Sequence, residues 1–157
     1  MRAVVLTVSD RVSGGEAADL SGPAAAAALL ELGFEPEVRV IPDGVDSVAA
    51  ALQTAVDDEV ALVVTTGGTG MAPRDLTPEA TLLVIEREAP GLSEAMRAAT
   101  LGELPHGMLS RGVSGIAGST LILNLPGSPR GVEESLAVVG PALAHAVALI
   151  RDESTSH

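Results

Sequence analysis

The stretch VALVVTTGGTGMAPRDLTP, residues 60–78, predicts a buried strand, a glycine-rich loop and the start of a helix in direct succession. Residues 60–64 form an apolar run of strand length. The glycines that follow are more than an ordinary turn requires. Because glycine has no Cβ, such a loop lets backbone amides approach a ligand, and Arg74 and Asp75 follow before the helix begins. The stretch therefore predicts a strand–loop–helix unit whose loop binds a ligand.

Strand-like and helix-like segments alternate along the whole chain. The predicted strands are 3–8, 38–41, 60–65 and 120–125. The predicted helices are 21–33, 47–56, two that begin near 77 and 91, and 128–150. Strands that alternate with helices form right-handed βαβ units, which build a parallel sheet. We expect one α/β domain over residues 1–151, a single doubly wound, mainly parallel sheet with helices on both faces, and a flexible tail at 152–157.

The composition limits the classes of partner. Of the 157 residues 46% are hydrophobic, which is typical of a globular domain. The chain has nine Arg and no Lys, and its net charge of -12 opposes broad attraction to nucleic acid or to an anionic membrane. Phe34 is the only aromatic residue among Phe, Trp and Tyr, so stacking on nucleic-acid bases is nearly unavailable.

Three features that the sequence lacks limit the class of protein further. The chain has no Cys, which excludes disulfides, Cys nucleophiles and Cys metal ligands. No apolar run approaches the roughly 18 residues of a membrane span, and the first residues lack the basic start of a signal peptide. We therefore expect a cytoplasmic protein. An anionic ligand would be bound locally, by glycine-loop amides, helix N-termini, single Arg side chains or a divalent metal.

Four groups of turn residues follow the predicted strands directly. They are Ser9-Asp10, Pro42-Asp43, Gly67-Gly68-Thr69-Gly70 and Pro126-Gly127-Ser128. In a doubly wound sheet, ligands bind outside the carboxyl ends of the strands. We therefore expect all four turns to lie along one edge of the sheet and to form the binding site.

The glycine loop at 67–70 matches neither of two common phosphate-binding motifs. A P-loop requires a Lys, and a dinucleotide-binding fingerprint would require Gly or Ala where Pro73 stands. Its position directly after a strand still favours contact with a ligand. The glycines of residues 112–118 precede a strand instead, so we interpret that segment as a structural hairpin or bulge.

Asp43 and Asp75 are candidate ligands of Mg²⁺. Both lie in loops at the predicted binding edge. Mg²⁺ prefers oxygen ligands and usually shares them with substrate phosphates. The alternative for Asp43 is a Pro-Asp-Gly turn in which the carboxylate binds the local backbone, and the alternative for Asp75 is a solvated turn residue. Their position beside the glycine loop favours the metal role and leaves both alternatives open.

Two helix starts flank the predicted site. Thr77 is expected to cap a helix that has Pro at its first position. Ser128, also followed by Pro, begins a helix whose free amides can bind an anion beside Arg130, and plain N-capping is a compatible alternative. We assign no chemistry to the three His residues, because their spacing is not typical of a metal site; they are His106, His145 and His157.

Several motifs together resemble the molybdopterin adenylyltransferase family. They are TVSDR at 7–11, IPD at 41–43, TTGGTGMAPRDLTPEAT at 65–81, IEREAPGLSEAM at 85–96 and MLSRGVSGIAGSTLILNLPGSPRG at 108–131. The family includes the bacterial MogA and MoaB proteins and the corresponding domains of plant Cnx proteins and of gephyrin. The resemblance covers nearly the whole chain, and the motifs are highly specific in this order.

The resemblance implies an enzyme of molybdenum cofactor biosynthesis, a nucleotidyltransferase that moves AMP from Mg-ATP to the phosphate of molybdopterin and releases pyrophosphate. It implies that Asp43 and Asp75 are the catalytic residues, here expected to hold Mg²⁺. The substrate-binding residues that it implies are Ser9, Asp10, Gly67, Gly68, Thr69, Gly70, Ser110, Arg111, Pro126, Gly127 and Ser128. We add Arg74 on chemical grounds, because Arg74, Arg111 or Arg130 can complete a clamp on phosphates. Some relatives carry Lys where this chain has Pro129 and Arg130.

The resemblance also implies partners: molybdopterin and ATP as substrates, assembly as a homotrimer or homohexamer, and handover to a molybdate-insertion enzyme. Two alternatives remain. One is a MoaB-type paralogue that adenylylates poorly or acts elsewhere in the pathway. The other is a non-enzymatic pterin-binding or assembly protein, against which the presence of both Asp43 and Asp75 argues.

Overall fold

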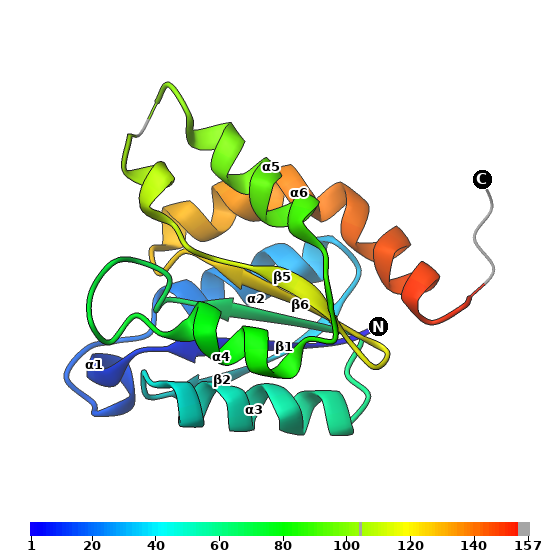
Figure 1. Cartoon of the computed structure of the whole chain (residues 1–157), viewed down its shortest axis with the longest axis horizontal. Helices are drawn as coiled ribbons and strands as arrows, with labels where there is room; N and C mark the ends of the chain where they lie inside the picture. The colour runs from blue at the N-terminus through cyan, green and yellow to red at the C-terminus, as the bar shows by residue number, and fades with distance from the viewer. Residues whose placement is uncertain (104, 154–157) are drawn as a thin grey trace.

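The fold is one six-stranded sheet with helices on both faces. A computed structural model describes residues 1–103 and 105–153. The elements are, in chain order, β1 (Arg2–Val8), α1 (Asp10–Ser13), α2 (Ser21–Glu31), β2 (Glu35–Ile41), α3 (Val45–Asp57), β3 (Leu62–Thr66), α4 (Thr77–Val84), β4 (Arg87–Glu88), α5 (Pro90–Thr100), the 3₁₀ helix η1 (Pro105–Leu109), β5 (Ser114–Ala117), β6 (Thr120–Leu125) and α6 (Pro129–Ile150). The strand order is β2-β1-β3-β6-β5-β4 (Figure 1).

The sheet is parallel over its main part and antiparallel at one edge. β2, β1, β3 and β6 are parallel neighbours, whereas β5 pairs with β6, and β4 with β5, in antiparallel fashion. The predicted doubly wound, mainly parallel fold is confirmed. The segment 112–118 is also confirmed as structural, because it contains β5, which forms a hairpin with β6.

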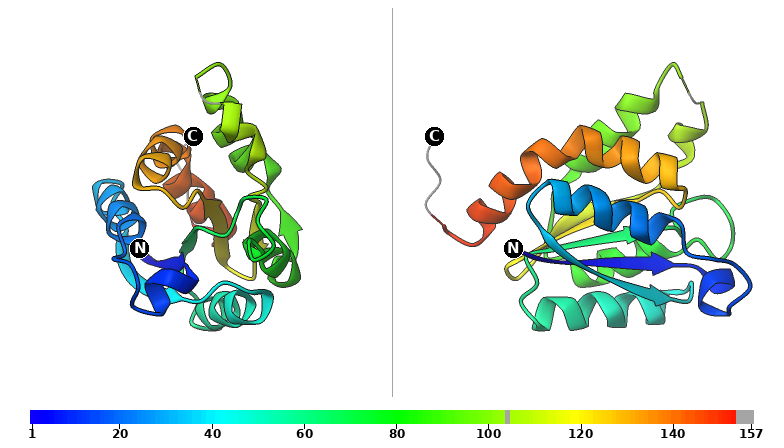
Figure 2. Two further views of the ribbon diagram at one scale, coloured as in Figure 1. Left: turned by 90° about the vertical axis from the view of Figure 1, so that its left-hand side faces the viewer. Right: turned by 180° about the vertical axis from the view of Figure 1, so that it is seen from behind.

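Alternating residues of the central strands point to opposite faces of the sheet. On one face, Val5, Val64 and Leu123 pack with α2, α5 and α6. On the other face, Leu6 and Val63 pack with α3 and α4. Figure 2 shows these two helical layers with the sheet between them. Because both faces are covered, the strands are apolar on both sides, as the continuous run at 60–64 predicts.

The core is almost entirely aliphatic. Phe34, the only aromatic residue, is buried between α2 and the sheet with 2% of its surface exposed. α6 has 22 residues and is long and apolar enough to cross a membrane by length and composition alone. Its apolar face is buried in the core instead, through Val132, Leu136, Val139, Leu143 and Val147. α6 is therefore packed as the core helix of a globular domain.

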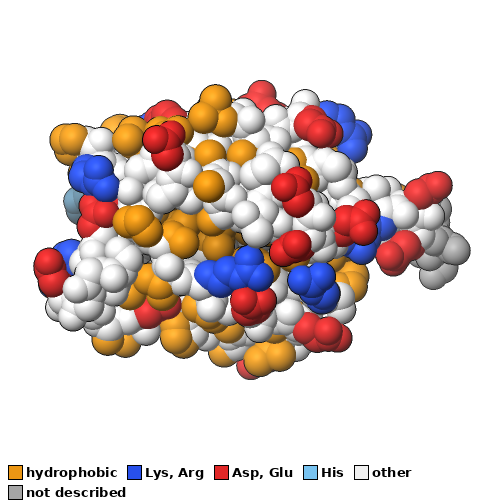
Figure 3. Space-filling view, turned by 90° about the horizontal axis from the view of Figure 1, so that it is seen from below, with side chains coloured by type: hydrophobic (Ala, Val, Ile, Leu, Met, Phe, Trp, Pro, Cys, Tyr) orange, Lys and Arg blue, Asp and Glu red, His pale blue; other side chains and the backbone are white. Residues whose placement is uncertain are grey.

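Charged side chains are mixed on the molecular surface. The space-filling view from below shows acidic and basic groups interspersed with hydrophobic ones, and neither sign dominates that face as a continuous field (Figure 3). Most of the predicted tail, residues 154–157 with His157, lies outside the described residues.

Candidate active site at the carboxyl edge of the sheet

The four predicted turns lie together at the carboxyl ends of β2, β1, β3 and β6, on the side of the molecule where α1 lies in Figure 1. Backbone hydrogen bonds join them across the edge. The Ser9 amide donates to the carbonyl of Ile41 at 2.9 Å, and the Gly67 amide donates to the carbonyl of Leu125 at 3.4 Å. Sequence positions more than a hundred residues apart thus form one rim.

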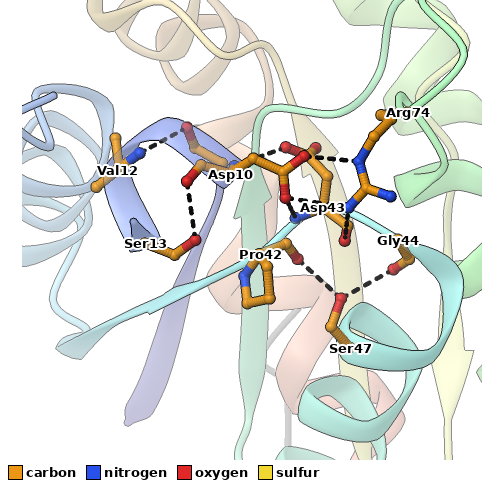
Figure 4. Close-up of polar contacts among 9 residues, drawn as sticks. Asp10, Val12, Ser13, Pro42, Asp43, Gly44, Ser47 and Arg74 are labelled. Atoms are coloured by element: carbon orange, nitrogen blue, oxygen red, sulfur yellow. Dashed lines mark hydrogen bonds and ion pairs between the residues drawn. The ribbon is translucent and has the colours of Figure 1, made fainter. Parts of the chain in front are cut away.

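Asp10, Asp43 and Arg74 form a clasp at this rim (Figure 4). The Asp10 amide donates to Oδ2 of Asp43 at 2.8 Å, and the Asp43 amide donates to Oδ1 of Asp10 at 3.2 Å. Arg74 donates from Nε and Nη2 to the two carboxylate oxygens of Asp10, at 2.6 and 3.0 Å, and from Nη2 to the carbonyl of Asp43 at 2.8 Å. The hydrogen-bonded Arg74 guanidinium holds the pKa of the Asp10 carboxyl below its usual value.

The clasp bears on two predictions. The Asp43 carboxylate accepts a hydrogen bond from a residue 33 positions away, so its partner is not the local Pro-Asp-Gly turn. Arg74 is held by Asp10 and the Asp43 carbonyl, so in this structure it fixes the loop that carries Asp43. A direct contact of Arg74 with substrate stays a prediction.

The glycine loop lies close to both candidate carboxylates. Gly67 has φ +90 and Gly68 has φ +65, conformations that side-chain-bearing residues rarely adopt. A Cβ on Gly68 would lie 3.2 Å from Oδ1 of Asp43, and a Cβ on Gly70 would lie 2.8 Å from Oδ2 of Asp75. Glycine at these positions keeps the space between both carboxylates and the loop backbone open.

Thr77 supports the glycine loop from below, and the prediction that it caps α4 is wrong. Leu76 is the N-cap residue, without a side-chain cap, and Thr77 is the first residue of the helix. The buried Thr77 hydroxyl donates to the carbonyl of Gly67 at 3.0 Å, and the Thr77 amide donates to the carbonyl of Gly68 at 3.1 Å. The side chain binds the loop because the loop returns over the helix start.

Arg111 fixes the other end of the loop. Its backbone amide donates to the carbonyl of Thr69 and its Nε donates to the carbonyl of Gly70, both at 2.8 Å. The guanidinium also donates to the carbonyl of Asp75 and to the Glu79 carboxylate. This hydrogen bonding lowers the pKa of the Glu79 carboxyl from its ordinary value. Arg111 therefore anchors the glycine loop to α4, and its predicted contact with substrate is untested.

Two compartments open at this rim, one on each side of the glycine loop. The first has a volume of about 380 Å³ and is lined by the loop and by the ends of β1 and β3, with Asp43 at its margin. The second has about 370 Å³ and lies between the loop and η1, with Ser110 in its wall. Both sizes suit a small-molecule ligand. Four residues line both compartments: Gly67, Gly68, Asp75 and Gly127.

The shared wall is thin because two backbones touch there. A Cβ on Gly127 would lie 3.2 Å from the Cα of Gly67. Ser128, next in the chain, is confirmed as the N-cap of α6, since its hydroxyl accepts from the Gly131 amide at 3.1 Å. The predicted residues of the glycine loop, Asp43, Asp75, Ser110, Pro126 and Gly127 all line one or both compartments.

Two polar residues at or beside the site were not predicted. Asp19 lines the first compartment, and its carboxylate accepts from the Thr7 hydroxyl at 2.8 Å and from the Gly22 amide at 2.9 Å. Asn124 is buried under the loop and donates to the Thr65 and Thr81 hydroxyls at 3.1 and 3.0 Å. Asn124 could have been found from the sequence, because it is a polar residue inside the apolar run of β6 and a buried polar residue needs hydrogen-bond partners.

The carboxylates suit a cation that is shared with a ligand. Within residues 1–103 and 105–153, no group of three or more His, Cys, Asp or Glu side chains is placed to hold a metal. Asp43 and Asp75 both line the first compartment, with Oδ1 of Asp43 beside Gly68 and Oδ2 of Asp75 beside Gly70, where it also accepts from the Ala72 amide at 2.9 Å. Mg²⁺ is commonly held by one or two carboxylates together with substrate phosphates, and the two residues fit that pattern.

A family model described as a probable molybdopterin binding domain matches residues 4–145. The chain belongs to this family. The domain is 43% identical to the molybdopterin adenylyltransferase of Helicobacter pylori strain J99, over 93% of this chain and 85% of that protein. Its fold matches a crystal structure of the molybdopterin biosynthesis enzyme MoaB from Thermus thermophilus with a TM-score of 0.92, at 44% identity and 99% coverage of both chains.

Some relatives are much longer than this molybdopterin-binding domain. The Dictyostelium discoideum gephyrin is 39% identical, and the match covers 97% of this chain but 23% of gephyrin. The Drosophila melanogaster protein cinnamon is 41% identical, with 95% of this chain and 25% of cinnamon covered. The chain thus spans about a quarter of these two relatives, and it corresponds to one part of each.

Proposed function

We propose that this chain is a molybdopterin adenylyltransferase, a nucleotidyltransferase of molybdenum cofactor biosynthesis. The observation that carries the proposal is the position of Asp75 and the glycine loop on the wall shared by two ligand-sized compartments. Direct transfer between two substrates requires their reacting atoms to lie within about 3–3.5 Å of each other, and the two compartments adjoin along these residues. Relatives that bear this enzyme name match at 43% identity over most of their length, which supports the same reaction here.

In the proposed reaction, a phosphate oxygen of molybdopterin attacks the α-phosphorus of ATP. A new oxygen–phosphorus bond forms, the bond from the α-phosphorus to the bridging β-oxygen breaks, and pyrophosphate leaves with that electron pair. The products are adenylyl-molybdopterin and pyrophosphate. Because the nucleophile belongs to the substrate, the protein needs no Cys or Ser–His pair, and it contributes positioning and charge neutralisation.

The position of each residue at the site indicates its role in the proposed reaction. The amides of Gly68, Thr69 and Gly70 belong to residues that line the second compartment and can bind phosphate oxygens, whereas the Gly67 amide already donates to the carbonyl of Leu125. The α6 N-terminus at Ser128 begins beside the same wall and favours negative charge there. Asp43 and Asp75 would hold Mg²⁺, which when bound neutralises triphosphate charge. The Arg74 clasp and the Arg111 anchor keep both carboxylates in place.

The test is to incubate the purified chain with molybdopterin, ATP and Mg²⁺ and to measure AMP transfer and pyrophosphate release. We expect both products in equal amounts. A MoaB-type paralogue is the second candidate, because a MoaB structure matches at a TM-score of 0.92. Molybdopterin binding without AMP transfer would favour that candidate or a pterin-binding assembly protein, and it would reject the enzyme.

We further propose that the protein acts in the cytoplasm, assembles as a homotrimer or homohexamer, and hands its product to a molybdate-insertion enzyme. The assembly and the handover rest on the family resemblance. Sedimentation at micromolar protein concentration tests the assembly. A fully active monomer would contradict it.

A further inference from the structure

The Arg side chains predicted to bind phosphate are all paired with carboxylates. Arg74 is paired with Asp10, with 2.6 Å between Nε and Oδ2. Arg111 is paired with Glu79, and Arg130 with Glu134 at 2.6 Å. Each guanidinium is therefore already neutralised where it lies. Backbone amides and the α6 N-terminus carry no full charge, so a chain of net charge -12 without Lys needs another Arg at this edge if a cationic side chain is to contact an anionic substrate.

Arg97, in the last turn of α5, meets that need. Its Nη1 donates to the carbonyl of Gly112 at 2.8 Å, which fixes the side chain. Among the residues that the structure describes, no carboxylate forms an ion pair with Arg97. The side chain is only partly exposed. Arg97 is thus a held, partly buried cation whose charge is not neutralised by an ion pair within the described chain.

Arg97 lines a small pocket that adjoins the second compartment. The pocket has a volume of about 50 Å³, which suits a compact group rather than a ring system. Three residues line both this pocket and the second compartment: Gly107, Ser110 and Pro126. Asn124 and Ser93 also line the pocket, whose surface is otherwise mostly apolar. The two cavities therefore share a wall, so a compact group of a substrate in the second compartment can extend into the pocket that Arg97 lines.

We propose that Arg97 binds an anionic group of the acceptor substrate. The second compartment is then the binding site for molybdopterin. The inference rests on the proposed function for the identity of that substrate. Molybdopterin carries two groups with the required chemistry, its phosphate and its dithiolate. The first compartment has Asp19, Asp43 and Asp75 in its lining, so a triphosphate there depends on metal, whereas Arg97 supplies a cation in the pocket that adjoins the second compartment.

The experiment measures equilibrium binding of molybdopterin, without ATP, to the parent, Arg97→Met, Arg97→Lys and Arg87→Met. Arg87 is an exposed Arg of the edge strand β4 and lines neither compartment, so it serves as the matched control. Loss of a charge-assisted hydrogen bond should weaken molybdopterin binding by about 10- to 100-fold in Arg97→Met. The molybdopterin affinity of Arg97→Lys should lie between those of the parent and Arg97→Met. Arg87→Met should bind molybdopterin as the parent does.

Two further measurements separate binding from structure. Thermal melting and Mg-ATP affinity of Arg97→Met should stay close to those of the parent. A loss of Mg-ATP affinity as large as that for molybdopterin would overturn the assignment, because it would indicate a general structural role. Parental molybdopterin affinity in Arg97→Met would overturn it as well.

A modified ligand identifies the anionic group. Molybdopterin with both thiolates alkylated keeps its phosphate. If Arg97 binds the phosphate, Arg97→Met weakens binding of both ligands; if it binds the dithiolate, the variant and the parent bind the alkylated ligand equally. A parent that binds molybdopterin without transferring AMP would reject the proposed function alone and leave the Arg97 comparison valid.

Discussion

Replacing Gly68 by Ala tests how the glycine loop is held. Gly68 has φ +65, and an added Cβ would lie 2.2 Å from Oγ1 of Thr77. The Thr77 side chain cannot move aside easily, because it is fully buried and its hydroxyl donates to the carbonyl of Gly67. The substitution should therefore displace the loop, the helix start, or both.

The expected loss of stability in Gly68→Ala is the sum of three effects. Left-handed backbone costs an L-residue about 1–2 kcal/mol. Overpacking against a rigid neighbour adds about 1–3 kcal/mol, and loss of the Thr77 hydrogen bond adds about 1 kcal/mol. We expect Gly68→Ala to lower the free energy of unfolding by about 3–6 kcal/mol, a large share of the roughly 5–15 kcal/mol of a typical domain.

Gly15→Ala is the matched control for backbone strain alone. Gly15 has φ +78, but a Cβ there would meet nothing within 4 Å. Gly15→Ala should lower the free energy of unfolding by about 1–2 kcal/mol. Urea unfolding followed by far-ultraviolet circular dichroism compares the two variants with the parent. If Gly68→Ala costs no more than Gly15→Ala, the contact with Thr77 does not constrain the loop, and the reasoning is refuted.

Three further predictions concern the carboxylates. Asp75→Asn should keep the fold and molybdopterin binding but abolish AMP transfer, measured as radiolabelled product; parental turnover or an unfolded variant would contradict the metal role of Asp75. Chelation by EDTA should abolish ATP binding in calorimetry but weaken molybdopterin binding much less, and an equal loss of both would mean that metal organises the whole pocket. Arg111 lowers the folded-state pKa of Glu79, so the contribution of this pair to stability is present above the unfolded-state pKa and is lost as pH falls through the folded-state value. Glu79→Gln should therefore destabilise the protein at neutral pH and have little effect in acid, as urea unfolding at both pH values can show.

The parallel strands and their loops were predictable from sequence because each strand end combines an apolar run with an abrupt change to Gly, Pro, Ser or Asp. The edge strands were not predictable in the same way. β4 has two charged residues, Arg87–Glu88, and β5 has four residues with a glycine among them. Their strand conformation depends on the pairing of β4 with β5 and of β5 with β6. The local preferences of the residues do not predict such pairing.

The roles of the Arg side chains at the site could not be predicted from the sequence either. Arg74 meets Asp10 across 64 positions, and Arg111 meets Glu79 across 32. Sequence reasoning identified Arg as the chemistry suited to phosphate, but ion pairing depends on which carboxylate lies opposite in the folded chain. Arg97 was overlooked for the converse reason, since its position in a helix of mixed polarity carries no local signal.

The aliphatic core makes this protein nearly transparent in the near ultraviolet. Phe34 is the only aromatic residue, and it is a weak chromophore that lies buried against the sheet. The absorbance of a bound pterin or adenine can therefore be followed directly, without the Trp and Tyr signals that obscure it in most enzymes. A single Trp introduced beside either compartment would be the only strong protein fluorophore, so its emission would report occupancy of that compartment alone.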